Sequence, residues 1–241
     1  MKLYNFTLAP NGRRVKIFLK YKNKEIPEQE INVRDGEQFN EPFKSMNPFN
    51  CVPFLHLDDG TVISESISIC RYLEEEHFPD PNLFGSTPQM RAYIDMWNRR
   101  LELDGYSPLG NAIRNKSSFF VNRVLAGTRN DIKQMPEIVE RGIQMIELLF
   151  QRIDQHLEKN KFICGEQFTI ADITGYSIFK SCELLKFEIP KNVKFGHGNI
   201  FKLKNGVNLV GCYHPSPRNV NTGRINEKMM TQLFQKVKRL D

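Results

Sequence analysis

The stretch from Asn47 to Glu76 constrains the fold of this chain most strongly, and it reads NPFNCVPFLHLDDGTVISESISICRYLEEE. The pattern predicts a strand over 54–57 that starts after a proline, and a tight turn at Asp59-Gly60. A second strand over 62–64 follows, and a helix begins at about Ser66. We therefore expect a β-hairpin that leads directly into a helix.

The residues before this stretch predict an α/β unit. Lys2–Thr7 alternates as a strand does, and Ala9–Gly12 has turn chemistry. Arg13–Tyr21 has the apolar spacing of a helix, and Ile26–Val33 suits a second strand. The order β-α-β followed by β-β-α predicts one α/β domain of about 80 residues.

After a linker over 77–87 the pattern becomes helical. Residues 89–103, 138–157 and 170–185 carry apolar residues at three- and four-residue spacing. Thr169 and Asp172 form a predicted capping box: the threonine hydroxyl accepts from the Asp172 amide, and the carboxylate returns the bond. A helical domain therefore follows the α/β domain.

The pattern changes once more near Lys191. Residues 199–204 and 207–213 predict two strands joined by an Asn-Gly turn. A polar loop containing HPSPR follows, and a last helix is predicted over 227–240. A hairpin after a helical domain is unexpected.

Composition excludes several classes of protein. Hydrophobic residues make up 40% of the 241 residues and charged residues 26%, and no apolar run approaches the ~20 residues of a membrane span. The first residues lack the pattern of a signal peptide, so we expect a cytoplasmic protein without membrane contact. Five scattered cysteines indicate reduced thiols, and no metal site is predicted.

The net charge of +6 is unevenly placed. The last 51 residues hold ten Lys or Arg and two acidic residues, a net charge of +8, whereas the first 190 residues carry −2. Such asymmetry is typical of a segment that meets phosphate, and also of a solvated basic tail. Both interpretations stay open from composition alone.

Three separated motifs resemble those of a cytosolic glutathione S-transferase, namely MKLYNFTLAPNGRRVKIFL, the hairpin and helix quoted above, and FICGEQFTIADITGYSIF. The resemblance covers about residues 1–188. It implies the glutathione transferase fold, with a thioredoxin-like α/β domain over 1–78 and an all-α C-terminal domain, here truncated, over 86–188. It also implies glutathione as co-substrate, a small electrophile or disulfide as second substrate, no metal, and a homodimer.

The resemblance assigns a glutathione site to two short segments. The Val52-Pro53 bond is predicted to be cis, since X-Pro is the common place for such a bond. In the family the backbone of the preceding residue, here Val52, pairs with the cysteinyl part of glutathione. Glu65 and Ser66 at a helix N-terminus suit the amino group and the carboxylate of the γ-glutamyl end. The alternative is that Glu65 and Ser66 only cap the helix.

The catalytic residue is less clearly indicated. Relatives place a Ser, Cys or Tyr near the end of the first strand, where it stabilises the glutathione thiolate, but Ala9 occupies the aligned position. We predict Asn11 as the donor, then Thr7, then Tyr4. The alternative for Asn11 is a role only in the turn before the helix.

Three neighbouring residues have open alternatives. Cys51 lies beside the predicted glutathione segment, where packing is expected rather than reactivity. Arg13 and Arg14 open the first helix, and they face glutathione, a dimer partner or solvent. Periodicity does not distinguish these possibilities.

The end of the chain resembles a different family. Residues 193–241, above all HPSPRNVNTGR, are similar to the C-terminal end of a type-B uracil-DNA glycosylase. The resemblance implies that His214 stabilises charge on a leaving base, that Ser216 belongs to the loop in the DNA groove, and that Arg218 contacts phosphate or the groove. The other half of such an active site has no counterpart in residues 1–190, so we predict no base excision.

The sequence thus supports one main hypothesis and two alternatives. The main hypothesis is a glutathione transferase-like enzyme that activates the glutathione thiolate for addition to an electrophile or for disulfide reduction. One alternative is a noncatalytic protein that binds glutathione or, weakly through its basic tail, nucleic acid. The other is a chimeric chain whose glycosylase-like fragment is inactive.

Overall fold

The computed structural model describes residues 1–129, 131–185, 200–202 and 208–210. The chain divides into two compact units, Met1–Leu185 and Lys186–Asp241. Each unit is described by itself.

A four-stranded mixed sheet forms the base of the first unit. Its order is β2-β1-β3-β4, in which β1 pairs with β2 in parallel and with β3 antiparallel, while β3 and β4 form the antiparallel hairpin. All four predicted strands are confirmed, most of them shorter than expected. They are β1 (Lys2–Asn5), β2 (Glu28–Glu30), β3 (Phe54–His56) and β4 (Val62–Ser64).

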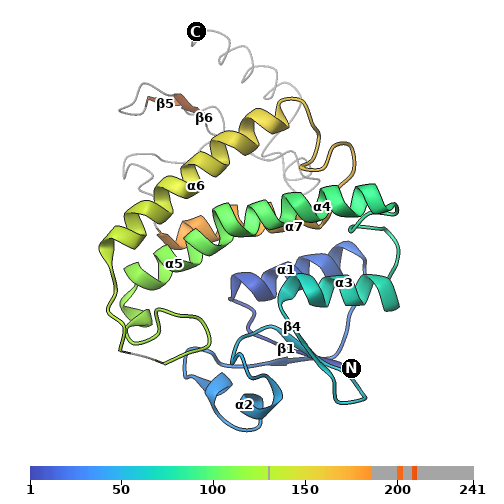
Figure 1. Ribbon diagram of the computed structural model, residues 1–241, viewed down its shortest axis with the longest axis vertical. Coiled ribbons are helices and arrows are strands. Elements are labelled where there is room, and N and C mark those ends of the chain that lie inside the picture. The colour runs from blue at the N-terminus through green and yellow to red at the C-terminus, as the bar shows by residue number, and fades with distance from the viewer. Residues whose placement is uncertain (130, 186–199, 203–207, 211–241) are drawn as a thin grey trace. The chain divides into compact units, whose positions relative to one another are not determined.

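Helices cover both faces of this sheet (Figure 1). Helices α1 (Pro10–Tyr21) and α3 (Ser66–Glu76) lie on the face toward the helical half, and α2 (Phe43–Met46) lies on the other face, after the short helix η1 (Glu37–Phe39). The sheet and the two longer helices share one apolar core because their inward side chains are fully buried. Among these side chains are Leu3, Phe18, Leu55, Ile69 and Leu73. The predicted thioredoxin-like α/β domain is confirmed.

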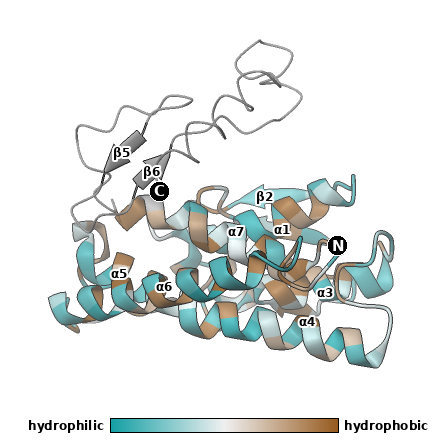
Figure 2. Ribbon diagram, turned by 90° about the horizontal axis from the view of Figure 1, so that it is seen from above, coloured by the Kyte–Doolittle hydropathy of each residue, from teal (hydrophilic) through white to brown (hydrophobic). Residues whose placement is uncertain are grey.

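The second half of this unit is helical, as predicted. Figure 2 shows hydrophobic and hydrophilic bands along α4 and α6, the pattern of helices with one buried side. The first predicted helix continues without a break into a π-helical segment, η2, and then into α5. The segments are α4 (Pro88–Leu101), η2 (Glu102–Tyr106), α5 (Ser107–Lys116), η3 (Ser118–Phe120), α6 (Pro136–Leu157), α7 (Ile170–Cys182) and η4 (Glu183–Leu185).

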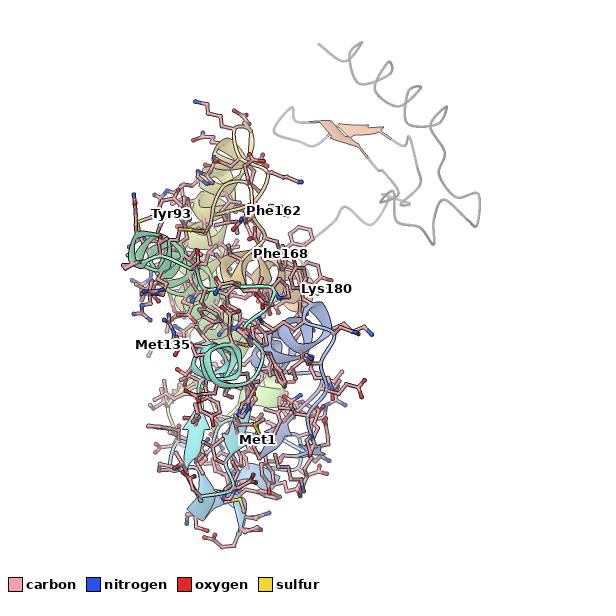
Figure 3. All side chains as sticks on the ribbon, turned by 90° about the vertical axis from the view of Figure 1, so that its right-hand side faces the viewer. Met1, Tyr93, Met135, Phe162, Phe168 and Lys180 are labelled. Atoms are coloured by element: carbon pink, nitrogen blue, oxygen red, sulfur yellow. The ribbon has the colours of Figure 1, made fainter. Side chains whose placement is uncertain are left out.

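The turn before α7 is held by the carboxylate of Asp172. It accepts from the backbone N–H groups of Thr169 and Ile163, each at 2.8 Å. The rings of Phe162 and Phe168 pack nearby with centroids 5.7 Å apart (Figure 3). Of the two hydrogen bonds of the predicted capping box, the one from the Thr169 amide to the Asp172 carboxylate is confirmed. The other differs, because the Asp172 amide donates to the backbone oxygen of Thr169 rather than to its hydroxyl.

Helix α7 is apolar on more than one side, as its sequence predicts. Ile170, Ile173 and Ile178 are buried against the neighbouring helices, whereas Tyr176 and Phe179 are 54% and 64% exposed. Large apolar side chains therefore remain in contact with solvent on the outer side of α7.

The second unit contains a described hairpin. Strands β5 (Ile200–Lys202) and β6 (Asn208–Val210) pair antiparallel, with Ile200 opposite Val210. These two short strands lie within the predicted ranges 199–204 and 207–213, and the origin of the hairpin in a different fold stays a prediction. The predicted helix over 227–240 and the predicted residues His214, Ser216 and Arg218 lie outside the described residues.

None of the helices in the described ranges is both long enough and apolar enough to cross a membrane. Four cysteines within these ranges, Cys51, Cys70, Cys164 and Cys182, are free thiols.

A buried ion pair fixes the linker between the two halves of the first unit. Lys22 Nζ lies 2.9 Å from Glu74, and both side chains are almost fully buried. The lysine also donates to the carbonyl oxygens of Phe78 and Pro81, each at 2.7 Å. The carboxylate accepts from the backbone amides of residues 83 and 84. Charges that have been removed from water are tolerated because each has several partners.

Replacing Lys22 by Met should therefore destabilise the protein by about 3–5 kcal/mol, since it leaves a buried carboxylate without its cation. The matched control is Lys16→Met, which removes a largely exposed ion pair with Glu28 and should cost less than about 1 kcal/mol. Urea unfolding measures both values. Equal costs for the two variants would contradict a stabilising role of the buried pair.

Candidate functional site

The sheet register brings the predicted site segments to one edge. Tyr4 pairs with Phe54, and Phe54 pairs with Ser64. Because both pairings are antiparallel, the chain after β1, the chain before β3 and the chain after β4 all emerge at this same edge. The predicted site segments therefore share this edge of the sheet with the N-termini of α1 and α3. They are Thr7–Asn11, Val52-Pro53 and Glu65-Ser66. Two helix N-termini at one edge favour the binding of an anion there.

The Val52-Pro53 bond is cis, as predicted. Val52 is partly exposed, and Pro53 is buried at the start of β3. The hydrogen bonds made within the described part of the chain use neither the N–H nor the C=O of Val52. Both backbone groups are thus available to pair with an extended peptide.

Glu65 and Ser66 do not cap α3 through their side chains. Glu65 is the N-cap residue, but its side chain accepts no capping bond, and its φ of 69° lies in the left-handed region that non-glycine residues rarely adopt. Ser66 is 1% exposed, and its hydroxyl has no partner among the described residues. The interpretation that these residues only cap the helix is therefore wrong. A buried hydroxyl without a partner costs free energy, and this cost is recovered when a ligand supplies the bond.

Asn11 lies in the first turn of α1 and is partly buried. Its side-chain oxygen accepts from Arg14 Nη2 at 2.9 Å. Since a guanidinium only donates, this bond determines the orientation of the amide and leaves its NH₂ group facing away from Arg14. Asn11 thus presents a hydrogen-bond donor, the group that a thiolate requires.

Thr7 has different neighbours. Its backbone N–H and its hydroxyl both donate to the carboxylate of Glu30, each at 2.9 Å. The hydroxyl hydrogen is therefore already used. Tyr4, the third predicted donor, is buried between Phe43 and Phe54, and its ring stacks on Phe54 at 4.7 Å. Of the three candidates, Asn11 has the hydrogen-bond donor that is most available to a bound thiolate.

Of the three alternatives for Arg13 and Arg14, namely glutathione, a dimer partner or solvent, the solvent-facing one is wrong for Arg14. Arg14 is 3% exposed and forms an ion pair with Glu102 at 2.8 Å. Its guanidinium also lies over the Tyr106 ring, 4.2 Å from the centroid. Arg13 donates to the Ser181 hydroxyl at 3.3 Å. Both arginines thus connect α1 to the helical half.

The hydrogen bond from Arg14 to Asn11 was not among the alternatives that the sequence offered for this arginine. Its bond to Asn11 and its contacts with η2 join the predicted catalytic residue to the second half of the unit. The signal available in the sequence was weak: an arginine three residues after an asparagine on the same helix lies within reach of it.

Cys51 precedes Val52 and is partly buried. Burial raises the pKa of its thiol, the nearby carboxylate of Glu65 raises it further, and the cation of Arg114 opposes them. The expectation of packing rather than reactivity agrees with this environment, because a thiol with a raised pKa is a poor nucleophile.

Two of the hollows in the described part of the chain contain no predicted site residue. One, of about 420 Å³, lies between α5 and α6 beside Ser107 and Gly142. The other, of about 530 Å³, is bordered by Tyr93 and Cys164, and burial raises the pKa of the Cys164 thiol to about 11. Burial thus disfavours the nucleophilic thiolate form of Cys164.

Comparison with known families agrees with this geometry. The sequence model of the glutathione S-transferase N-terminal domain matches residues 9–76, and that of the glutathione S-transferase C-terminal domain matches residues 123–205. Glutathione S-transferase D7 of Drosophila melanogaster is 30% identical over 192 residues, which cover 79% of each chain. The chain belongs to the glutathione S-transferase family. This membership supports a glutathione-binding, transferase-like enzyme.

Solved structures give the same result. A glutathione S-transferase domain-containing protein of Marinobacter aquaeolei superposes with a TM-score of 0.71 at 30% identity, over 80% of this chain and 91% of that one. Gtt2 of Saccharomyces cerevisiae superposes with a TM-score of 0.69 at 27% identity, over 79% of this chain and 89% of that one. The C-terminal family match extends to residue 205, so it includes residues 193–205, which also carry the start of the glycosylase resemblance.

Proposed function

We propose that this protein binds glutathione at the described edge of the sheet and activates its thiol for attack on a small electrophile or a disulfide. The observation that carries the proposal is the buried hydroxyl of Ser66 beside the backbone of Val52, neither of which has a hydrogen-bond partner among the described residues. Ser66 and the N-terminus of α3 bind the γ-glutamyl carboxylate, Glu65 binds the amino group, and Val52 pairs with the cysteinyl part after cis-Pro53. Glutathione carries all of these groups in one extended peptide.

Asn11 is the proposed catalytic donor. Its NH₂ group donates to the sulfur, and the N-terminus of α1 adds positive potential, so the thiolate forms at lower pH than in water. The thiolate then attacks a carbon and expels its leaving group, or attacks a disulfide and releases the second thiol. Thr7 is the weaker candidate because its hydroxyl already donates a hydrogen bond to Glu30.

Replacing Ser66 by Ala should weaken glutathione binding about 10- to 100-fold, the value of a hydrogen bond to a charged group. Stability should not fall, since the hydroxyl has no partner within the described residues to lose. Calorimetric titration with glutathione and thermal unfolding test the two statements. The matched control is Ser68→Ala, an exposed position on the same helix. Equal affinities of the two variants would refute the role of Ser66.

Replacing Asn11 by Ala should lower kcat about 100-fold, as removal of a hydrogen bond to a developing anion does. Thr7→Val should leave kcat close to the wild-type value. The assays are turnover of a chloronitrobenzene and of a glutathione mixed disulfide, which also separate conjugation from reduction. A larger loss in Thr7→Val than in Asn11→Ala would reverse the assignment.

A noncatalytic glutathione-binding protein is the alternative that Ala9 keeps open. Retention on immobilised glutathione without turnover of either substrate would favour it. No binding at millimolar glutathione would refute the transferase function altogether.

We further propose a homodimer, as the family resemblance implies, and a cytoplasmic location, which agrees with the four free thiols. Sedimentation of the purified protein tests the dimer.

For residues 193–241 we propose a fragment derived from a uracil-DNA glycosylase that is inactive in base excision. The support is the sequence HPSPRNVNTGR, which includes His214, Ser216 and Arg218. The basic residues of this segment give at most weak, salt-dependent affinity for nucleic acid. No uracil should be released from single-stranded DNA. Release that disappears in His214→Ala would overturn this proposal.

A further inference from the structure

The connection that follows α5 extends from the helical half toward α2 (Figure 1). The part of it nearest α5 is fixed by Arg114, whose Nη1 donates to the carbonyl oxygen of Arg123 at 2.8 Å. The same guanidinium lies over the Phe120 ring, 4.7 Å from the centroid. Residues 127–129, here called the clasp, lie further along this connection and contact the α/β half at two places.

The first contact of the clasp is between Gly127 and the turn before Val52. The φ of Gly127 is 67°, in the left-handed region. A Cβ at Gly127 would lie 1.9 Å from the Phe49 carbonyl oxygen and 3.0 Å from Cys51 Sγ. Asn50 Nδ2 also donates to the Gly127 carbonyl oxygen at 3.3 Å. Glycine is required here, since both the backbone conformation and the close approach exclude a side chain.

The second contact of the clasp is between Arg129 and the residues before α2. The guanidinium lies over the Phe39 ring, 4.8 Å from the centroid. A Cβ at Gly36, which is buried and has a φ of 78°, would lie 2.1 Å from Arg129 Nη2. A second left-handed glycine thus lies where the clasp meets the α/β half. The clasp therefore contacts the segment 36–51, which contains α2, at both of its ends.

The turn that ends at Val52 is held together by the side chain of Asn47. Asn47 is 1% exposed, and its Nδ2 donates to the Cys51 carbonyl oxygen at 2.8 Å. Its Oδ1 accepts from the Phe49 amide at 3.1 Å. The Cys51 carbonyl and the Val52 N–H belong to one planar peptide group. A displacement of this turn therefore displaces the Val52 backbone.

We propose that Gly127 and Arg129 are positioning residues of the glutathione site, because they fix the turn that sets the Val52 backbone. The inference rests on the proposed function and deepens it. The clasp belongs to a connection of the helical half, whereas Val52 belongs to the α/β half and pairs with the cysteinyl part of glutathione. Glutathione affinity thus depends on residues that do not bind glutathione themselves.

The first test is glutathione binding and turnover in Gly127→Ala. The new Cβ forces one of the two backbones to move by about 1 Å, so the Kd and the KM for glutathione should rise about tenfold. kcat should stay within about twofold, since the pairing with Val52 is the same in the ground and transition states. The matched control is Gly60→Ala, because Gly60 has a φ of 87° but nothing within 4 Å of its Cβ position.

A second variant, Arg129→Met, removes the guanidinium without a collision and decides the question if Gly127→Ala does not fold. It should raise the glutathione Kd about threefold or more. Arg123→Met is its matched control, since Arg123 lies over Phe119 at 4.6 Å within the connection itself. An unchanged Kd in either folded clasp variant, an equal rise in its control, or a loss of kcat at unchanged KM would overturn the proposal.

Amide hydrogen exchange without glutathione separates this proposal from the proposed function. The amides of Phe49 and Asn50 donate to Asn47 at 3.1 and 3.0 Å, and they should exchange faster in Arg129→Met than in Arg123→Met. If wild-type protein binds no glutathione, the proposed function fails, while faster exchange still supports the positioning of the turn. Equal exchange in the two variants overturns that positioning whatever the glutathione result.

Discussion

The arrangement of the first unit depends most on the contacts made by the Arg14 guanidinium. It is buried at the junction of the two halves, where it meets Glu102 of η2, the Tyr106 ring and the Thr174 hydroxyl of α7 at 3.5 Å. A buried charge without such partners would cost several kcal/mol, and these contacts offset that cost even though Arg14 Nε has no partner among the described residues. The same guanidinium holds Asn11. The contact that joins the halves therefore also orients the proposed catalytic amide.

Much of the fold followed from local pattern. The hairpin and helix over 54–76 matched the structure to within about a residue, because turn chemistry at Asp59-Gly60 and apolar alternation act locally. The cis bond before Pro53 was likewise predicted from one dipeptide. Periodicity did not reveal the π-helical turns of η2, since an apolar spacing of three and four residues fits both helix types over so short a segment.

The parts of the site that escaped prediction depend on long-range contacts. Glu30 accepts a hydrogen bond from the Thr7 hydroxyl because β1 and β2 pair in parallel, with Asn5 opposite Glu30. Gly127 meets Cys51 only because a connection 76 residues further along the chain folds back. Arg14 turns inward because a second layer of helices covers α1. Neither propensity nor hydrophobic spacing records such pairings.

By our proposal, Ala9 changes which groups stabilise the glutathione thiolate and does not remove the function. A thiolate is stabilised by any correctly oriented donor or cation in a site of low polarity. By our proposal the Asn11 amide and two helix N-termini share that role. The central claim is that Arg14 sets the orientation of the Asn11 donor.

The most direct test of this claim is a double-mutant cycle on the pKa of the bound glutathione thiol, using Arg14→Met and Asn11→Ala in proteins shown to be folded. If Arg14 acts through Asn11, each single variant raises the pKa, and the double variant raises it no further than Asn11→Ala alone. Shifts that add in the double variant would contradict the account, because Arg14 and Asn11 would then act independently.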